Sequence, residues 1–205
     1  MRPRDVVLSL ASLALVGAGI ALISTFFLRP GASGSNTSEE SGNFEVPVLQ
    51  EGTQATEEAV QSGPADKTLR LTIPKMARIS NSVVPDAAGD NEDKLKNYAA
   101  IHLEGTGFPW EKGSNVYIAG HRLGFPDYAS FLAFYDLDAL QKGDEIVVTD
   151  AAGGQYTYRV FDGFVVGPSD LSVTKPIEGK DVLTLQTCTL PDYTQRLIVQ
   201  AEKVA

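Results

Sequence analysis

The sequence predicts an all-β fold, a barrel or sandwich of roughly 140 residues that begins near residue 68. Two observations lead to this prediction. Short runs rich in β-branched and aromatic residues recur between turn signals, and prolines fall in the connections, where a missing N–H does little harm. The expected strands are 69–73, 116–119, 145–149, 156–166, 182–187 and 196–204.

Two short segments between these runs have the composition of helices. The first is 92–99, with Asp90 or Asn91 as its N-cap. The second is 129–140, which a Lys-Gly pair follows. Because both are short, we expect them to cover openings of a predominantly β domain.

The beginning of the chain differs from this globular region in composition. Residues 6–28 carry no charged side chain over 23 positions, and about 20 apolar residues span a bilayer as a helix. Arg2 and Arg4 precede this run and an acidic segment follows it. The positive-inside rule then places residues 1–5 in the cytoplasm and the remainder outside, so we expect a single-pass anchor in the cell membrane.

A cleaved signal peptide is the rival interpretation of this run. Its apolar region typically spans only about 7–15 residues, and Phe26 and Phe27 interrupt any small-residue cleavage site here. The uncleaved anchor is therefore favoured. Residues 29–67 are rich in Gly, Ser, Thr, Glu and Gln and predict a flexible acidic linker. The domain expected to follow is 68–205.

Charge and cysteine content narrow the classes of function. The net charge of −9 disfavours nucleic-acid binding, which needs a clustered basic face. The single cysteine, Cys188, excludes an intramolecular disulfide and raises the question of a reactive thiol. The alternative is a buried, inert cysteine that serves as a small hydrophobe.

Three chemically active side chains stand at ends of expected strands. Cys188 closes the run 182–187, Arg196 opens the next run after a loop of seven residues, and His121 follows the run 116–119. A thiol, an imidazole and a guanidinium supply a nucleophile, a proton carrier and a cation for developing negative charge. This set is what acyl transfer by a cysteine requires.

Strand alternation adds a prediction about where these groups point. Successive side chains in a strand lie on opposite faces of the sheet. In each of the three strands the more apolar set alternates with a set that contains the active side chain. If the apolar sets face the core, then Cys188, Arg196 and His121 share the outer face. The pattern therefore predicts a shallow external groove that holds all three groups.

These residues resemble the sortase family, the membrane-anchored cysteine transpeptidases of Gram-positive bacteria. The TLxTC motif of the family corresponds to 184–188, its A-G-H-R context to 119–122, and its arginine at the start of the last strand to Arg196. Further similarity covers the I-P-K segment at 73–75, the H-x-x-G-T segment at 102–106 and the stretch 134–144.

The resemblance implies an eight-stranded sortase-type β-barrel behind a transmembrane helix and a linker. It also implies that Cys188 attacks the Thr–Gly bond of an LPxTG-like or LAxTG-like sorting signal on a secreted protein. An amine of a cell-wall precursor, or of a pilin, then takes the acyl group from the thioacyl enzyme. His121 is expected to transfer protons, and Arg196 to hold the substrate backbone or the oxyanion. No cofactor and no metal are expected.

Other residues near the motifs receive lesser roles. Thr187, Leu171 and Val173 are candidates for substrate contact, with Leu171 and Val173 in the connection that shapes recognition in this family. His102, the only other histidine, is expected to be structural or to line the groove. Arg122 and Arg159 are the alternative cations, the first expected to point away from His121 and the second to lie on a solvated strand face.

The amino-acid residues of these motifs most resemble those of the class E, actinobacterial type of the family. An Asp-Pro-aromatic lid, the signature of pilin-polymerising enzymes, is absent from the linker sequence, which makes that role the less favoured alternative. Two further alternatives stay open. One is a surface-anchored β-barrel that binds a partner without catalysis, and the other is a hydrolase that shares the acyl-enzyme but uses water as acceptor.

Overall fold

The computed structural model describes residues 63–204. The anchor expected at 6–28, the segment 1–5 and most of the linker 29–67 lie outside these residues. Within 63–204, no helix is both long enough and apolar enough to cross a membrane. The end of the expected linker already contacts the domain, since Lys67 Nζ lies 4.8 Å from the ring centre of Trp110 and 5.1 Å from that of Phe108.

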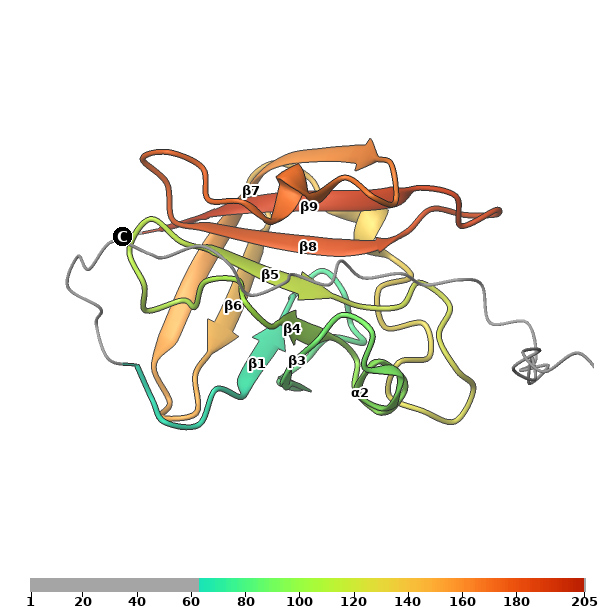
Figure 1. Cartoon of the computed structure of the whole chain (residues 1–205), viewed down its shortest axis with the longest axis horizontal. Coiled ribbons are helices and arrows are strands. Elements are labelled where there is room, and N and C mark those ends of the chain that lie inside the picture. The colour runs from blue at the N-terminus through green and yellow to red at the C-terminus, as the bar shows by residue number, and fades with distance from the viewer. Residues whose placement is uncertain (1–62, 205) are drawn as a thin grey trace, which may run out of the picture. The chain divides into compact units, whose positions relative to one another are not determined.

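Nine strands make up the sheet of the described residues (Figure 1). They are β1 (Leu69–Thr72), β2 (Ser82–Val84), β3 (Asp86–Ala87), β4 (Ile101–Leu103), β5 (Asn115–Ala119), β6 (Glu145–Thr149), β7 (Gln155–Val166), β8 (Val182–Cys188) and β9 (Arg196–Lys203). Their order in the sheet is β2-β1-β6-β7-β9-β8-β5-β4-β3. Six of them correspond to the predicted runs. The sequence pattern missed β2, β3 and β4, which are only two or three residues long.

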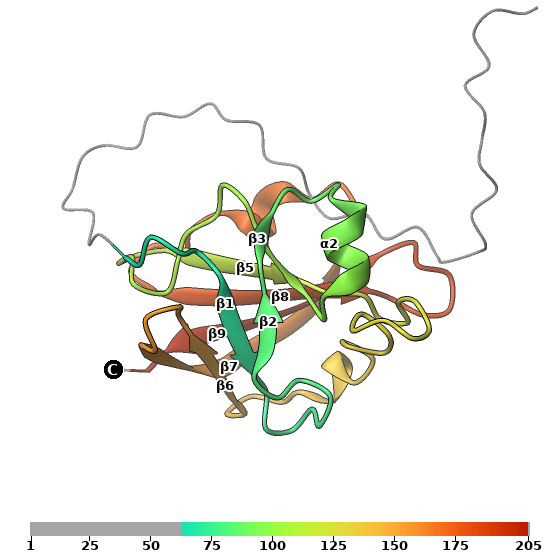
Figure 2. The ribbon, with the colours of Figure 1, turned by 90° about the horizontal axis from the view of Figure 1, so that it is seen from below.

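The two ends of this sheet order meet through the chain itself. β2 pairs with β1 and β3 pairs with β4, yet Pro85 alone separates β2 from β3 (Figure 2). The carbonyl of Pro85 accepts a hydrogen bond from the backbone N–H of His102 at 2.9 Å. The sheet therefore curves into a nearly closed barrel. The expected number of eight strands is wrong by one in the described part, because Pro85 divides one extended segment into two strands.

Helical structure is sparse, as predicted, but one of the two expected helices is absent. α2 (Glu92–Asn97) begins at Asn91, whose side chain accepts a hydrogen bond from the Lys94 N–H at 3.0 Å. Residues 129–140 form turns and the short 3-10 helix η1 (Leu137–Ala139). The reason is visible in the backbone: Leu132 has a φ of 54°, which no α-helix contains.

Both faces of the strands β5, β8 and β9 are buried. A first apolar cluster fills the barrel and includes Ile118, Leu185 and Val199. A second cluster lies on the opposite face and joins Tyr117 and Ile198 to residues from β3, β4, α2 and the 3-10 helix η2 (Leu171–Thr174). The face that carries the active side chains is thus covered by segments far away in the sequence.

Candidate active site

Cys188 and Arg196 are direct cross-strand partners. Cys188 is the last residue of β8, Arg196 is the first of β9, and the antiparallel register pairs them. Side chains of directly opposed residues lie on the same face with their Cβ atoms roughly 4.5–5.5 Å apart. The predicted hairpin is confirmed, and it sets the thiol and the guanidinium side by side at one end of the sheet.

His121 reaches the same end of the sheet from β5. β5 and β8 are parallel, with Ala119 opposite Gln186, and the N–H of Gly120 donates to the carbonyl of Gln186 at 3.0 Å. β5 ends at Ala119, and His121 follows two residues later, so the imidazole lies at the end of β5 that adjoins the end of β8 where Cys188 stands. The carboxyl ends of two neighbouring parallel strands therefore carry the imidazole and the thiol.

The three groups share a face, but the predicted shallow external groove is wrong. Cys188 and Arg196 are each 2% exposed and His121 is 8% exposed. Strand alternation correctly placed Cys188 and Arg196 on one face of the sheet. The prediction assigned that face to solvent because the opposite face of these strands carries more apolar side chains. The second apolar cluster covers this face, and Val173 of η2, which is 5% exposed, is part of the cover.

A glycine directly before His121 allows this close packing. A Cβ atom at Gly120 would lie 2.9 Å from the carbonyl oxygen of Ala99 and 3.0 Å from the ring of Phe134. The backbone N–H of Phe134 also donates to the carbonyl of His121 at 3.0 Å. The histidine backbone is therefore fixed on one side by β8 and on the other by the loop that follows it.

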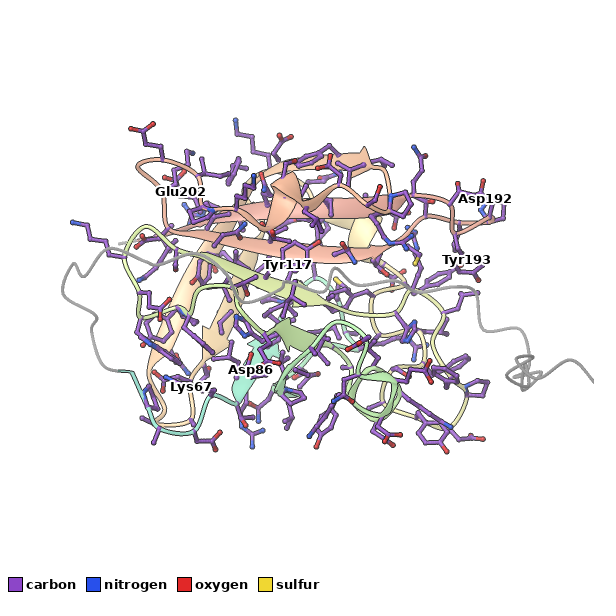
Figure 3. All side chains as sticks on the ribbon, in the orientation of Figure 1. Lys67, Asp86, Tyr117, Asp192, Tyr193 and Glu202 are labelled. Atoms are coloured by element: carbon purple, nitrogen blue, oxygen red, sulfur yellow. The ribbon has the colours of Figure 1, made fainter. Side chains whose placement is uncertain are left out.

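The loop between β8 and β9 orients the guanidinium. Arg196 Nη1 donates to the backbone carbonyls of Tyr193 at 3.1 Å and of Gln195 at 3.2 Å. The loop is closed by hydrogen bonds from the Thr189 N–H to Gln195 and from the Tyr193 N–H to Thr189. Figure 3 shows Tyr193 and Asp192 at this end of the hairpin, with Glu202 at the other end of β9.

Buried polar side chains continue along the same face away from Cys188. The Tyr117 hydroxyl donates to the side-chain carbonyl of Gln186, and the Thr184 hydroxyl donates to Asn115 Oδ1 at 2.8 Å. Burial raises the pKa of Tyr117, which Arg196 opposes and the Asp170 carboxylate reinforces. We did not predict this network, although alternation puts Asn115 and Tyr117 on the face of His121, a signal that was available.

Burial controls the charge of His121. Desolvation lowers the pKa of His121 to about 4, so that its imidazole is neutral near pH 7. The edge-to-face contact with Phe125, at 5.5 Å between ring centres, contributes to this apolar environment. A neutral imidazole is able to accept a proton from a thiol.

The predicted substrate-contact residues differ in position. Leu171 is 43% exposed at the start of η2, whereas Val173 is buried in the second apolar cluster. Thr187 lies on the opposite strand face from Cys188, with its side chain fully buried and its hydroxyl without a hydrogen-bond partner. It is therefore not brought together with Cys188, His121 and Arg196. Of the three candidates, Leu171 alone is open to solvent next to the covered face.

The alternative cations and the second histidine have other partners. Arg122 pairs with Asp138 at 2.5 Å, and Arg159 pairs with Glu145 at 3.0 Å on the surface. His102 is fully buried, with Nδ1 2.8 Å from the Asp86 carboxylate and Nε2 3.0 Å from the Gly107 carbonyl. Its structural interpretation is thus confirmed. Over residues 63–204, no group of three or more His, Cys, Asp or Glu side chains has the arrangement of a metal site.

Comparison with known proteins identifies the family. The sortase domain family matches residues 71–204. The chain belongs to the sortase family. Among characterised relatives, sortase A of Streptococcus agalactiae serotype III (strain NEM316) is 36% identical over 91 residues, a segment that spans 44% of this chain and 36% of that protein. The chain therefore matches only about a third of the length of this relative.

Solved sortase structures have the same fold. A sortase D5 transpeptidase from Clostridium perfringens has a TM-score of 0.57 and 30% identity, and the alignment covers 68% of this chain and 79% of that one. Sortase C1 of Streptococcus agalactiae has a TM-score of 0.55 and 34% identity, with 66% of each chain covered. Sortase A of Corynebacterium diphtheriae has a TM-score of 0.58 and 26% identity, over 71% of this chain and 63% of that one.

Proposed function

We propose that this sortase-family protein is a membrane-anchored cysteine transpeptidase. It cleaves an LPxTG-like or LAxTG-like sorting signal of a secreted protein between Thr and Gly and transfers the acyl group to an amine of a cell-wall precursor. One observation carries the proposal: Cys188 and Arg196 are cross-strand partners, and His121 follows the adjoining end of the neighbouring strand β5, so the three groups lie at the same end of the sheet. Membership of the family supports the same reaction.

In the first half-reaction, Cys188 Sγ forms a bond to the threonine carbonyl carbon. His121, neutral because burial lowers its pKa to about 4, accepts the thiol proton as that bond forms. The carbonyl oxygen then carries the negative charge of a tetrahedral intermediate. When the C–N bond breaks, the imidazolium gives its proton to the departing glycine nitrogen, and a thioester remains on Cys188.

In the second half-reaction, an amine attacks the thioester carbonyl carbon. His121 takes a proton from the attacking nitrogen, the C–S bond breaks, and Cys188 leaves as a thiolate that recovers a proton. Water in place of the amine gives hydrolysis by the same route. The outcome therefore depends on which nucleophile reaches the acyl-enzyme first.

Arg196 stabilises the negative charge that develops in both half-reactions. An arginine guanidinium stays protonated and offers five N–H donors. Two carbonyls of the β8–β9 loop hold Nη1, so the group is preorganised opposite Cys188. A cation that is already oriented in a buried site stabilises an oxyanion without reorganisation during the reaction.

The subtype and the acceptor belong to the proposal as well. We favour the class E, actinobacterial type because the motif residues around Cys188 and His121 resemble those of that class. A pilin lysine is the second candidate acceptor, because a sortase C2 of the group B Streptococcus pilus island 1 is among the structural relatives, with 30% identity and a TM-score of 0.58.

The proposal is tested by product analysis with the full chain in detergent. LPxTG and LAxTG peptides are incubated with and without triglycine, and the peptide products are identified by mass. We expect a new amide between the threonine and triglycine in wild type. Neither Cys188→Ala nor His121→Gln should form it at a comparable rate. A rate in Cys188→Ala equal to wild type would refute the role of the thiol.

Three further outcomes separate the alternatives. A threonine acid as the sole product, at any triglycine concentration, would indicate a hydrolase or a different acceptor. No cleavage of any peptide by folded wild-type protein would favour a binding barrel without catalysis. Replacement of triglycine by a lysine-containing pilin-type peptide tests the second acceptor, and a faster reaction with that peptide would favour pilin polymerisation.

A further inference from the structure

The imidazole of His121 has an aromatic neighbour in the loop that follows β5. The rings of His121 and Phe125 meet edge to face, with 5.5 Å between centres and an interplanar angle of 89°. In this arrangement the positive edge of one ring points at the negative face of the other, which fixes relative orientation as well as distance. A ring that contacts the imidazole edge-on restricts its rotation.

Phe125 is itself held by groups from two elements. The Tyr128 ring meets it edge to face at 6.5 Å and 79°. Lys96, in α2, has its Nζ 5.3 Å from the centre of the Phe125 ring and 4.4 Å from that of Tyr128. Cations within about 6 Å of a ring centre are attracted to its face. The contacts therefore link α2 to His121 through one phenylalanine.

The backbone of the loop directs Phe125 toward the histidine. Gly124 has a φ of 64°, and a Cβ atom there would lie 2.1 Å from the carbonyl oxygen of Ser130, so only glycine fits. Ser130 is fully buried, and its hydroxyl accepts the Phe125 N–H at 3.3 Å. The Leu132 N–H donates to Leu123 at 2.8 Å and closes the loop. These contacts hold the loop in the conformation in which Phe125 contacts His121.

We propose that Phe125 is a positioning residue that orients the His121 imidazole for proton transfer, with Lys96 and Tyr128 as its support. The inference rests on the proposed function, because orientation matters only if His121 transfers protons. His121 must present one nitrogen in turn to the Cys188 thiol and to the leaving or attacking amine. An imidazole that rotates away lowers the rate of the chemical steps and leaves peptide binding largely unchanged.

The test compares Phe125→Leu with Phe131→Leu, in the full chain in detergent. Phe131 lies in the same loop, is 41% exposed and provides a matched change at the surface. We expect Phe125→Leu to lower kcat of the peptide reaction roughly tenfold with KM within about twofold, and Phe131→Leu to leave both near wild type. Phe125→Tyr keeps the ring and should restore most of kcat.

A spectroscopic measurement accompanies the kinetics and does not depend on activity. The chain has two histidines, so ¹³C-histidine labelling gives two imidazole signals, and His121→Gln assigns them. In Phe125→Leu the His121 signal should lose its ring-current shift, and the midpoint of its titration should rise from about 4 toward the ordinary value. Phe131→Leu should change neither.

The outcomes separate this inference from the proposed function. Unchanged kcat and an unchanged His121 signal in a folded Phe125→Leu protein would overturn the positioning role. Loss of activity in Phe125→Leu and Phe125→Tyr alike, with the ring-current shift retained in the latter, would also overturn it. If wild type cleaves no peptide, the proposed function fails while the histidine signal still reports whether Phe125 orients the ring.

Discussion

Cys188, Arg196 and His121 are almost enclosed by the protein, although arginine is a residue type that is usually exposed. Each is fixed through the backbone of a strand end, and Arg196 through two carbonyls as well. At the scale of single residues, burial therefore acts on chemistry in two ways. It orients the groups, and it sets the charge that His121 carries before the substrate arrives.

The residue-scale prediction concerns the dependence of folding stability on pH. The folded state lowers the pKa of His121 to about 4, so the unfolded chain binds more protons between about pH 6.5 and pH 4. The contribution of the neutral His121 imidazole to the unfolding free energy is fully present above about pH 6.5 and is lost as the pH falls toward about 4. Between pH 7.5 and 4.5 wild type should lose about 2–3 kcal/mol of unfolding free energy from this residue. Urea unfolding at both values measures it.

His121→Gln is the control for that measurement. Backbone and side-chain hydrogen bonds also lower the pKa values of Asp66, Asp144 and Asp170. Protonation of these carboxylates lowers the unfolding free energy of the protein only at still lower pH. They titrate equally in both proteins, so the difference between wild type and His121→Gln isolates the histidine. Equal losses in the two proteins over this range would show that His121 is not depressed in the folded state.

At the scale of elements, the sequence was a good guide wherever a run was long enough to show alternation. The runs near β7, β8 and β9 agree with the structure to within a residue or two. β2, β3 and β4 were missed because two or three residues cannot show a period. The prediction of a helix at 129–140 is wrong because Leu132 adopts a positive φ. The backbone of this segment forms successive turns instead.

The element-scale prediction concerns the cap of α2. The Asn91 side chain accepts the Lys94 N–H, and α2 has only six residues. Replacement of an N-cap side chain by alanine typically costs about 1 kcal/mol. We expect Asn91→Ala to lower the unfolding free energy by about that amount in urea unfolding at pH 7.5.

Asp90→Ala is the matched control, because the sequence alone left Asp90 and Asn91 as equal candidates for the cap. Asp90 is exposed and does not occupy the N-cap position in the structure. Its replacement should change the unfolding free energy by less than about 0.5 kcal/mol. A larger loss in Asp90→Ala than in Asn91→Ala would contradict the observed cap.

At the scale of the whole molecule, the decisive features come from residues distant in sequence. The barrel is nearly closed at Pro85, because β2 and β3 lie at opposite ends of the sheet order and only this residue separates them in the chain. The face of Cys188 is covered by segments such as η2, β3 and β4. Neither the closure nor the cover leaves a local pattern, which is why alternation predicted the shared face of the site and not its burial.

The central claim is that the Cys188 thiol is the acyl nucleophile of this molecule. Intact mass of the full chain after incubation with an LPxTG peptide, in the absence of amine, tests it most directly. We expect an adduct on Cys188 with the mass of the peptide up to its threonine, which is missing in Cys188→Ala and is released by triglycine. An adduct on another residue, or one that persists in Cys188→Ala, would contradict it.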